Sequence, residues 1–199
     1  MTQRLFCLML TTCWISSSFA GHGFMNAFGD VEWLPEPGKT PNQLGYEIDN
    51  WHERATLALA SSEERFEISL KFAREKLAEV ESMVIQEDRV AAQIAVDRYR
   101  DHLVVATQSL ADQTGDVLIE LNLRFANALL EHRYVLSVNY LDLPRDSRPT
   151  ILGVIDAANA SYETVAKKLT PKVKDSLFFK EEEVRWSVEL ARQADAQGL

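Results

Sequence analysis

From about Gln43 onward, apolar residues recur every three to four positions, which is the spacing of a helix with one buried face. The pattern predicts six helices, beginning near residues 43, 62, 88, 116, 150 and 171. In the second and third helices, steps of four and three residues alternate, as they do in coiled coils. We therefore expect an all-α fold over residues 43–199, a bundle of about six helices built from two similar antiparallel hairpins.

The apolar stripes also predict which residues form the core. In the first helix the residues that share a face are Leu44, Ile48, Trp51, Ala55 and either Ala58 or Leu59. The stripe of the third helix includes Tyr99, and the stripe of the fifth includes Tyr162, whereas Trp186 lies off the stripe of the sixth. The periodicity predicts that each stripe packs against the rest of the bundle.

Two parts of the chain resemble one another. The segment 70–73 (Leu-Lys-Phe-Ala) matches 123–126 (Leu-Arg-Phe-Ala), and 96–97 (Val-Asp) matches 155–156 (Ile-Asp). Such a pattern is typical of a duplicated helical hairpin, in which each copy buries its apolar face against the other. The alternative is that shared periodicity alone produces the matches, because any two amphipathic hairpins look alike.

The first twenty residues have the pattern of a secretory signal peptide rather than a transmembrane helix. Arg4 precedes a short apolar run over 5–15, and Ser18-Phe19-Ala20 offers small residues to a signal peptidase. We expect cleavage after Ala20 and export to the periplasm or the extracellular space. Two alternatives remain open: a lipoprotein site at Cys13, and an uncleaved leader that anchors the chain to the membrane.

Both cysteines, Cys7 and Cys13, lie inside this leader. A chain cleaved after Ala20 therefore has no thiol for a disulfide, for catalysis or for metal binding. Residues 21–42 follow as an extended, turn-rich arm, because glycine and proline interrupt every helical period. We expect the arm to pack in part against the bundle, the alternative being a disordered tail. Its apolar residues are Phe24, Phe28, Trp33 and Leu34.

The net negative charge of the chain argues against partners that are themselves negatively charged. The net charge is −9, and loss of the leader, whose one charged residue is Arg4, makes the chain more negative. Such a protein repels phosphate backbones and anionic membrane surfaces, so we expect no nucleic acid as partner. After cleavage of the leader we expect no transmembrane segment. We expect a protein partner, bound in a groove between the two hairpins or on an exposed apolar stripe that takes a helix or an extended segment. A heptad-rich chain is equally compatible with a homodimer.

The order of features within residues 34–110 resembles a bacterial exported family known only as a domain of unknown function. The residues that carry the resemblance are Leu34-Pro35, Pro41, Tyr46, Glu53-Arg54, Arg65-Phe66, Ala73 through Leu77, and Glu79. The match covers under half the chain, and its motifs are ordinary helix signals. The resemblance implies an exported α-helical fold, and it supplies neither an activity nor a catalytic residue.

Histidine is the commonest metal ligand, and the candidate ligands here are His52, His102 and His132. His102 and His132 fall on neighbouring helices, where they could meet. No two histidines are three or four residues apart, and the Glu-x-x-His pairs of di-iron bundles are absent. The main interpretation is therefore that they are surface or structural residues. We expect no cofactor and no catalytic residue, because haem, phosphate-loop, dinucleotide and nucleophile-elbow motifs are all missing.

Aromatic residues on several helices could form a binding surface, although helical spacing is also typical of core aromatics. These residues are Trp51, Tyr99, Tyr134, Tyr162 and Trp186. Taken together, the pattern favours a non-enzymatic exported protein that binds a protein partner in the cell envelope. The alternative is a periplasmic protein that binds a small molecule or a metal through an interhelical pocket or its histidines. An enzyme is a third alternative, because fold class alone excludes none.

Overall fold

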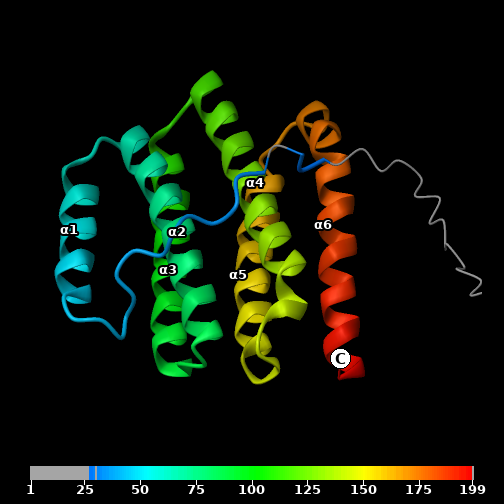
Figure 1. Ribbon diagram of the computed structural model, residues 1–199. Helices are drawn as coiled ribbons and strands as arrows, with labels where there is room; N and C mark the ends of the chain where they lie inside the picture. The colour runs from blue at the N-terminus through cyan, green and yellow to red at the C-terminus, as the bar shows by residue number, and fades with distance from the viewer. Residues whose placement is uncertain (1–26, 30, 199) are drawn as a thin grey trace, which may run out of the picture.

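The computed structural model describes residues 27–29 and 31–198, and it arranges the helices side by side in a row of hairpins (Figure 1). The predicted leader and the first residues of the arm lie outside the described residues. Within them, six α-helices and three short 3-10 helices form and no strand is present, so the predicted all-α bundle is confirmed. The elements are α1 (Tyr46–Leu59), α2 (Ser62–Ile85), α3 (Arg89–Ser109), η1 (Leu110–Asp112), α4 (Gly115–Val138), η2 (Tyr140–Asp142), η3 (Arg145–Ser147), α5 (Arg148–Ala166) and α6 (Pro171–Gln197).

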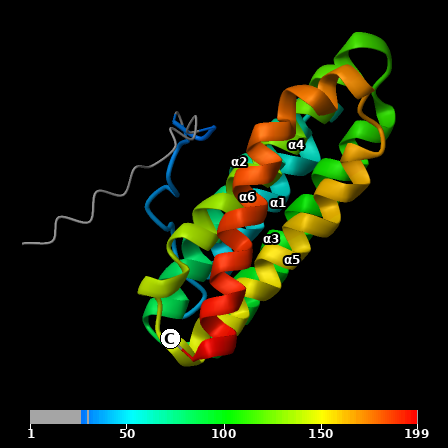
Figure 2. The same ribbon diagram turned by 90° about the vertical axis from the view of Figure 1, so that its right-hand side faces the viewer.

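Two antiparallel hairpins make up the centre of the row. Helices α2 and α3 form the first hairpin, and α4 and α5 form the second. Helix α1 lies against the outer side of the first hairpin, and α6 packs mainly on α4 (Figures 1 and 2). Helices α1 and α6 therefore occupy opposite edges of the row, and each has a side that no other described element covers.

Local signals explain where the helices begin. The Ser61 hydroxyl accepts from the Glu64 amide, and the Glu64 carboxylate accepts from the Ser61 amide, a capping box at the start of α2. Asp88 caps α3 by accepting from the Ala91 amide at 3.1 Å. Helix α1 begins at Tyr46 and not at Gln43 as predicted, because Gly45 adopts φ 88°, which ends the preceding turn.

The predicted stripes of the two hairpins form the core. Phe66 of α2 and Phe125 of α4 meet edge to face with ring centroids 5.8 Å apart, which joins the hairpins. Several matched pairs are buried in both hairpins, namely Ala73 and Ala126, Leu77 and Leu130, and Leu110 and Leu169. Ile119, the counterpart of Phe66, is half exposed instead. The duplication itself stays a prediction.

The described part of the arm runs across the bundle before it enters α1. The Ala27 amide donates to Glu183 on α6 at 2.9 Å, and Phe28 stacks on Tyr134 of α4 with ring centroids 4.2 Å apart. Further on, Arg74 of α2 donates to the Trp33 carbonyl at 2.6 Å. The arm therefore contacts α6, α4 and α2 on one side of the molecule (Figure 1). In the described part of the chain, no helix is long and apolar enough to cross a membrane.

Candidate functional site

The apolar face of helix α1 points toward solvent. The four largest residues of its stripe, Leu44 just before the helix and Ile48, Trp51 and Leu59 within it, are 100%, 70%, 70% and 89% exposed. The prediction that this stripe packs on the bundle is therefore wrong, although its residues do share a face. The residues that pack on the bundle come from the opposite side of the helix, and they are Tyr46, Asn50, Glu53 and Leu57.

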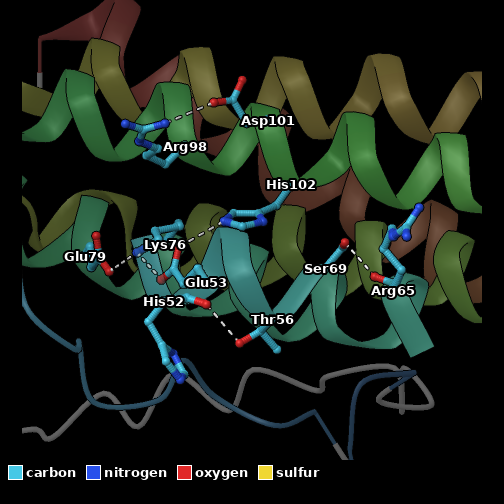
Figure 3. Close-up of polar contacts among 10 residues, drawn as sticks. All are labelled: His52, Glu53, Thr56, Arg65, Ser69, Lys76, Glu79, Arg98, Asp101 and His102. Carbon is cyan, nitrogen blue, oxygen red and sulfur yellow. Dashed lines mark hydrogen bonds and ion pairs between the residues drawn. The ribbon is translucent and has the colours of Figure 1, made fainter. Parts of the chain in front are cut away.

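A buried cluster of charges explains this orientation. Lys76 of α2 donates from Nζ to Glu53 Oε1 of α1 and to Glu79 Oε1 of α2, each at 2.7 Å. His102 of α3 places Nε2 3.4 Å from Glu53 Oε2. Figure 3 shows Glu53 between Lys76 and His102, with His52 pointing away from the cluster. A lysine that is buried this deeply requires a carboxylate partner, and α1 can supply Glu53 only by turning its polar side inward.

Burial and pairing act in opposite directions on these groups. For Glu53, burial works to raise the pKa, but hydrogen bonds from His102 and Lys76 outweigh it and hold the pKa below its usual value. For Lys76, burial works to lower the pKa, but hydrogen bonds to the two carboxylates raise it overall. Burial raises the pKa of Glu79 to about 7 despite the nearby Lys76. Lys76 and Glu53 therefore form an ion pair that stays charged through neutral pH, whereas Glu79 binds or releases its proton near neutral pH.

Polar groups also hold the two ends of α1. At its C-terminal end, Arg65 of α2 donates to the carbonyls of Leu57 and Ala60, each at 3.0 Å. These carbonyls belong to the last turn, where a helix has no donors of its own for them. Near its N-terminal end, the ring of Tyr46 lies 5.3 Å from Lys76 Nζ, in cation–π range. Contacts to α2 therefore fix the helix at its start, middle and end.

A small cavity opens beside the cluster, between α1 and α3. It measures about 190 Å³, and residues that line it include Asn50, Glu53, Arg98 and His102. Asn50 is buried, and neither polar atom of its side chain has a hydrogen-bond partner in the described part of the protein. Its amide can therefore donate and accept hydrogen bonds at the cavity wall.

The three candidate histidines lie in separate places. His52 is exposed on α1, His102 belongs to the buried cluster, and His132 of α4 lies 3.2 Å from the Tyr99 hydroxyl through Nδ1. Burial lowers the pKa of His132 to about 3, so its imidazole is neutral. His102 and His132 do not form the expected pair, because each faces a different neighbour. No group of three or more metal-ligating side chains occurs among residues 27–29 and 31–198.

The five candidate aromatic residues do not form one surface, so that prediction is wrong. Trp51 and Trp186 are exposed on α1 and α6, at opposite edges of the molecule. Tyr99 and Tyr162 are buried in the core, as their positions on the apolar stripes require. Tyr134 lies beneath Phe28 of the arm. Of the five, Trp51 alone belongs to the exposed stripe of α1.

Sequence reasoning did not single out Asn50, Lys76 or Arg65 as site residues. The available signal was the resemblance, since Tyr46, Glu53 and Glu79 are among the residues that carry it, and the structure brings these three together around Lys76. Arg65 belongs to the same set and closes the end of α1.

A family model described as "Domain of unknown function (DUF5667)" matches residues 38–143, about half of the chain. The chain belongs to this family. The DUF5667 match begins before α1 and extends past α4, so it includes α1, the first hairpin and every residue of the buried cluster. Neither the curated proteins nor the solved structures contain a significant match to this chain.

Proposed function

We propose that this DUF5667 protein is an exported, non-enzymatic binding protein of the cell envelope, and that the outward stripe of α1 receives an amphipathic helix of a protein partner. The observation that carries the proposal is the orientation of α1. A helix that exposes the large residues of its apolar stripe keeps apolar surface in contact with water, and a partner with a matching stripe removes that unfavourable contact. The leader of the sequence supports export.

The cluster behind α1 supports the same proposal. Because Glu53 is paired with Lys76 and His102, rotation of α1 to bury its stripe would leave a buried Lys76 without Glu53. Breaking a buried ion pair costs about 3–5 kcal/mol, and the same rotation would bring the buried Tyr46 and Leu57 into water, which offsets the gain from covering the stripe. The helix is therefore held in an orientation suited to an external partner.

A photo-crosslinking experiment tests the proposal in the native host. A photo-reactive amino acid replaces Ile48 on the stripe, and in a matched strain it replaces Gln93, which is exposed on α3. We expect a discrete adduct from position 48 alone, mapped to an amphipathic helix and lost in the Trp51→Ser background. Equal crosslinking at the two positions, or an adduct indifferent to Trp51→Ser, contradicts the proposal.

A second function has its own supporting observation, which is the buried Asn50 amide at the cavity beside Glu53 and His102. The cavity of about 190 Å³ is smaller than most ligand pockets, so the polar groups at its wall suit an ion or a polar molecule of only a few atoms. Native mass spectrometry of the protein purified from its host tests this alternative. A stoichiometric added mass that disappears in Asn50→Leu supports it, and a bare chain in both proteins contradicts it.

A further inference from the structure

The outward side of α1 is complementary to itself. Within α1 its apolar residues are spaced almost symmetrically about Trp51, because Ile48 lies three residues before it and Ala55 four after. Two helices that pack antiparallel across a two-fold axis place residues equally far before and after the axis at the same level. An axis at Trp51 therefore sets a larger side chain against a smaller one along the stripe and stacks Trp51 on its own copy.

The charges beside the stripe follow the same symmetry. Glu47 lies four residues before Trp51 and Arg54 three after, and because seven residues are close to two turns, both lie on one flank of α1. On the other flank, Asp49 lies two residues before Trp51 and His52 one after. A two-fold axis of this kind turns each flank toward the same flank of the second copy. Each carboxylate then meets the basic residue of the other copy, twice per dimer.

These charges have no ion-pair partner of their own. Glu47 and Arg54 are exposed, and neither forms an ion pair with any residue in 27–29 or 31–198, although part of Arg54 also lines the cavity between α1 and α3. On the other flank, the half-buried Asp49 and the exposed His52 likewise form no ion pair within those residues. Opposite charges that lack ion-pair partners beside an apolar stripe, as Glu47 and Arg54 do, specify the orientation of an incoming helix.

We infer that the helix received by α1 is α1 of a second copy, packed antiparallel across a two-fold axis at Trp51. This inference rests on the proposed function, because it names the occupant of the same stripe. A helix of 14 residues is about 21 Å long, and a pair of this length buries an area at the low end of specific interfaces. The dimer is therefore reversible and forms as the concentration rises.

Sedimentation velocity of the full chain over a concentration series tests the inference. Glu47→Arg and Arg54→Glu each replace two attractive contacts per dimer with two repulsive ones, so each should raise the dissociation constant at least about fivefold. The double variant Glu47→Arg/Arg54→Glu restores opposite charges and should return to within about threefold of the wild type. Trp51→Asp should abolish the dimer, and Trp186→Asp on α6, where the side chain is similarly exposed, should leave it unchanged.

Restored dimerisation in the double charge reversal supports the inference, because only a reciprocal contact between these two residues produces it. A dimer that tolerates Trp51→Asp overturns the inference, since it uses another surface. A chain that is monomeric at every concentration also overturns it. If the chain is monomeric but position 48 forms a Trp51-dependent adduct with a different protein, the proposed function is retained and only the inference is wrong. If no such adduct forms, both the proposed function and the inference are wrong.

Discussion

Replacing Lys76 with methionine should loosen α1 selectively, because this ammonium joins α1 to α2. Without Nζ, Glu53 retains only its contact with His102, and Glu79 retains no ion pair among the described residues. Removing one member of a buried ion pair costs about 3–5 kcal/mol. We therefore expect Lys76→Met to lower the free energy of unfolding by this amount at pH 8, where both carboxylates are charged in the wild type.

The loss should be smaller in acid. Glu79 already has a pKa of about 7, and removing Lys76 takes away an interaction that holds that pKa down. At pH 5.5 Glu79 is protonated in both proteins, so Lys76→Met leaves only Glu53 without its ion-pair partner, and the destabilisation should fall to roughly half. Urea unfolding at pH 5.5 and pH 8 measures both values.

The matched control is Lys71→Met on the same helix. Lys71 is exposed and pairs with Glu75, at 3.7 Å, so we expect a change within about 0.5 kcal/mol. Amide hydrogen exchange should accelerate in α1 of Lys76→Met before it does so in α6, which locates the effect. If Lys76→Met and Lys71→Met have the same unfolding free energy at pH 8, the buried cluster does not anchor α1 and the reasoning fails.

Three other substitutions probe the same helix. Glu79→Gln should flatten the dependence of stability on pH between about 5 and 8. The pKa of Glu79 rises from 4.5 to about 7 on folding, so protonation of this carboxyl favours the folded state at low pH. This contribution is lost as the pH rises through 7. Urea unfolding at the two ends of that range measures this dependence. If the free energy of unfolding changes with pH as much in the variant as in the wild type, Glu79 does not have this role. Arg65→Ala removes two hydrogen bonds to the last turn of α1 and should cost about 1–3 kcal/mol, with faster amide exchange in that turn; exchange that matches the wild type would show that the cap is dispensable. Trp51→Ser should change the stability of the dilute protein by less than about 0.5 kcal/mol, because the side chain is mostly exposed, and a larger loss in thermal unfolding would mean that the indole packs on the bundle.

Periodicity was enough to predict the helices and the two hairpins, because the information they need is local. The alternating steps of α2 and α3 place Leu77 and Leu103 on the apolar faces of their helices, and both are buried. The capping box at the start of α2 is a local signal of the same kind, because Glu64 follows Ser61 by three residues. The beginning of α1 was misplaced, because the turn that precedes it depends on the positive φ of Gly45.

The orientation of α1 could not be predicted in this way. A periodic pattern says which residues share a face, but not which face the rest of the protein covers. That choice depends on Lys76 and His102, which are far from Glu53 in the sequence and reach it only when the hairpin has formed. The candidate site failed for a related reason, because Tyr99 and Tyr162 were grouped with Trp51 by residue type, although their own stripes placed them in the core.

The rate at which a thiol reagent labels the Ile48→Cys variant tests most directly whether the outward face of α1 is a binding surface. Both native cysteines lie in the predicted leader, so the Gln93→Cys variant, with its thiol on the exposed side of α3, gives the reference rate. The account predicts that the two variants label equally fast as dilute purified proteins. In the host, where a partner helix covers the stripe, the thiol at position 48 should label at least about tenfold more slowly than the thiol at position 93. Equal rates at the two positions in the host, or slow labelling at position 48 in the dilute protein, would contradict the account.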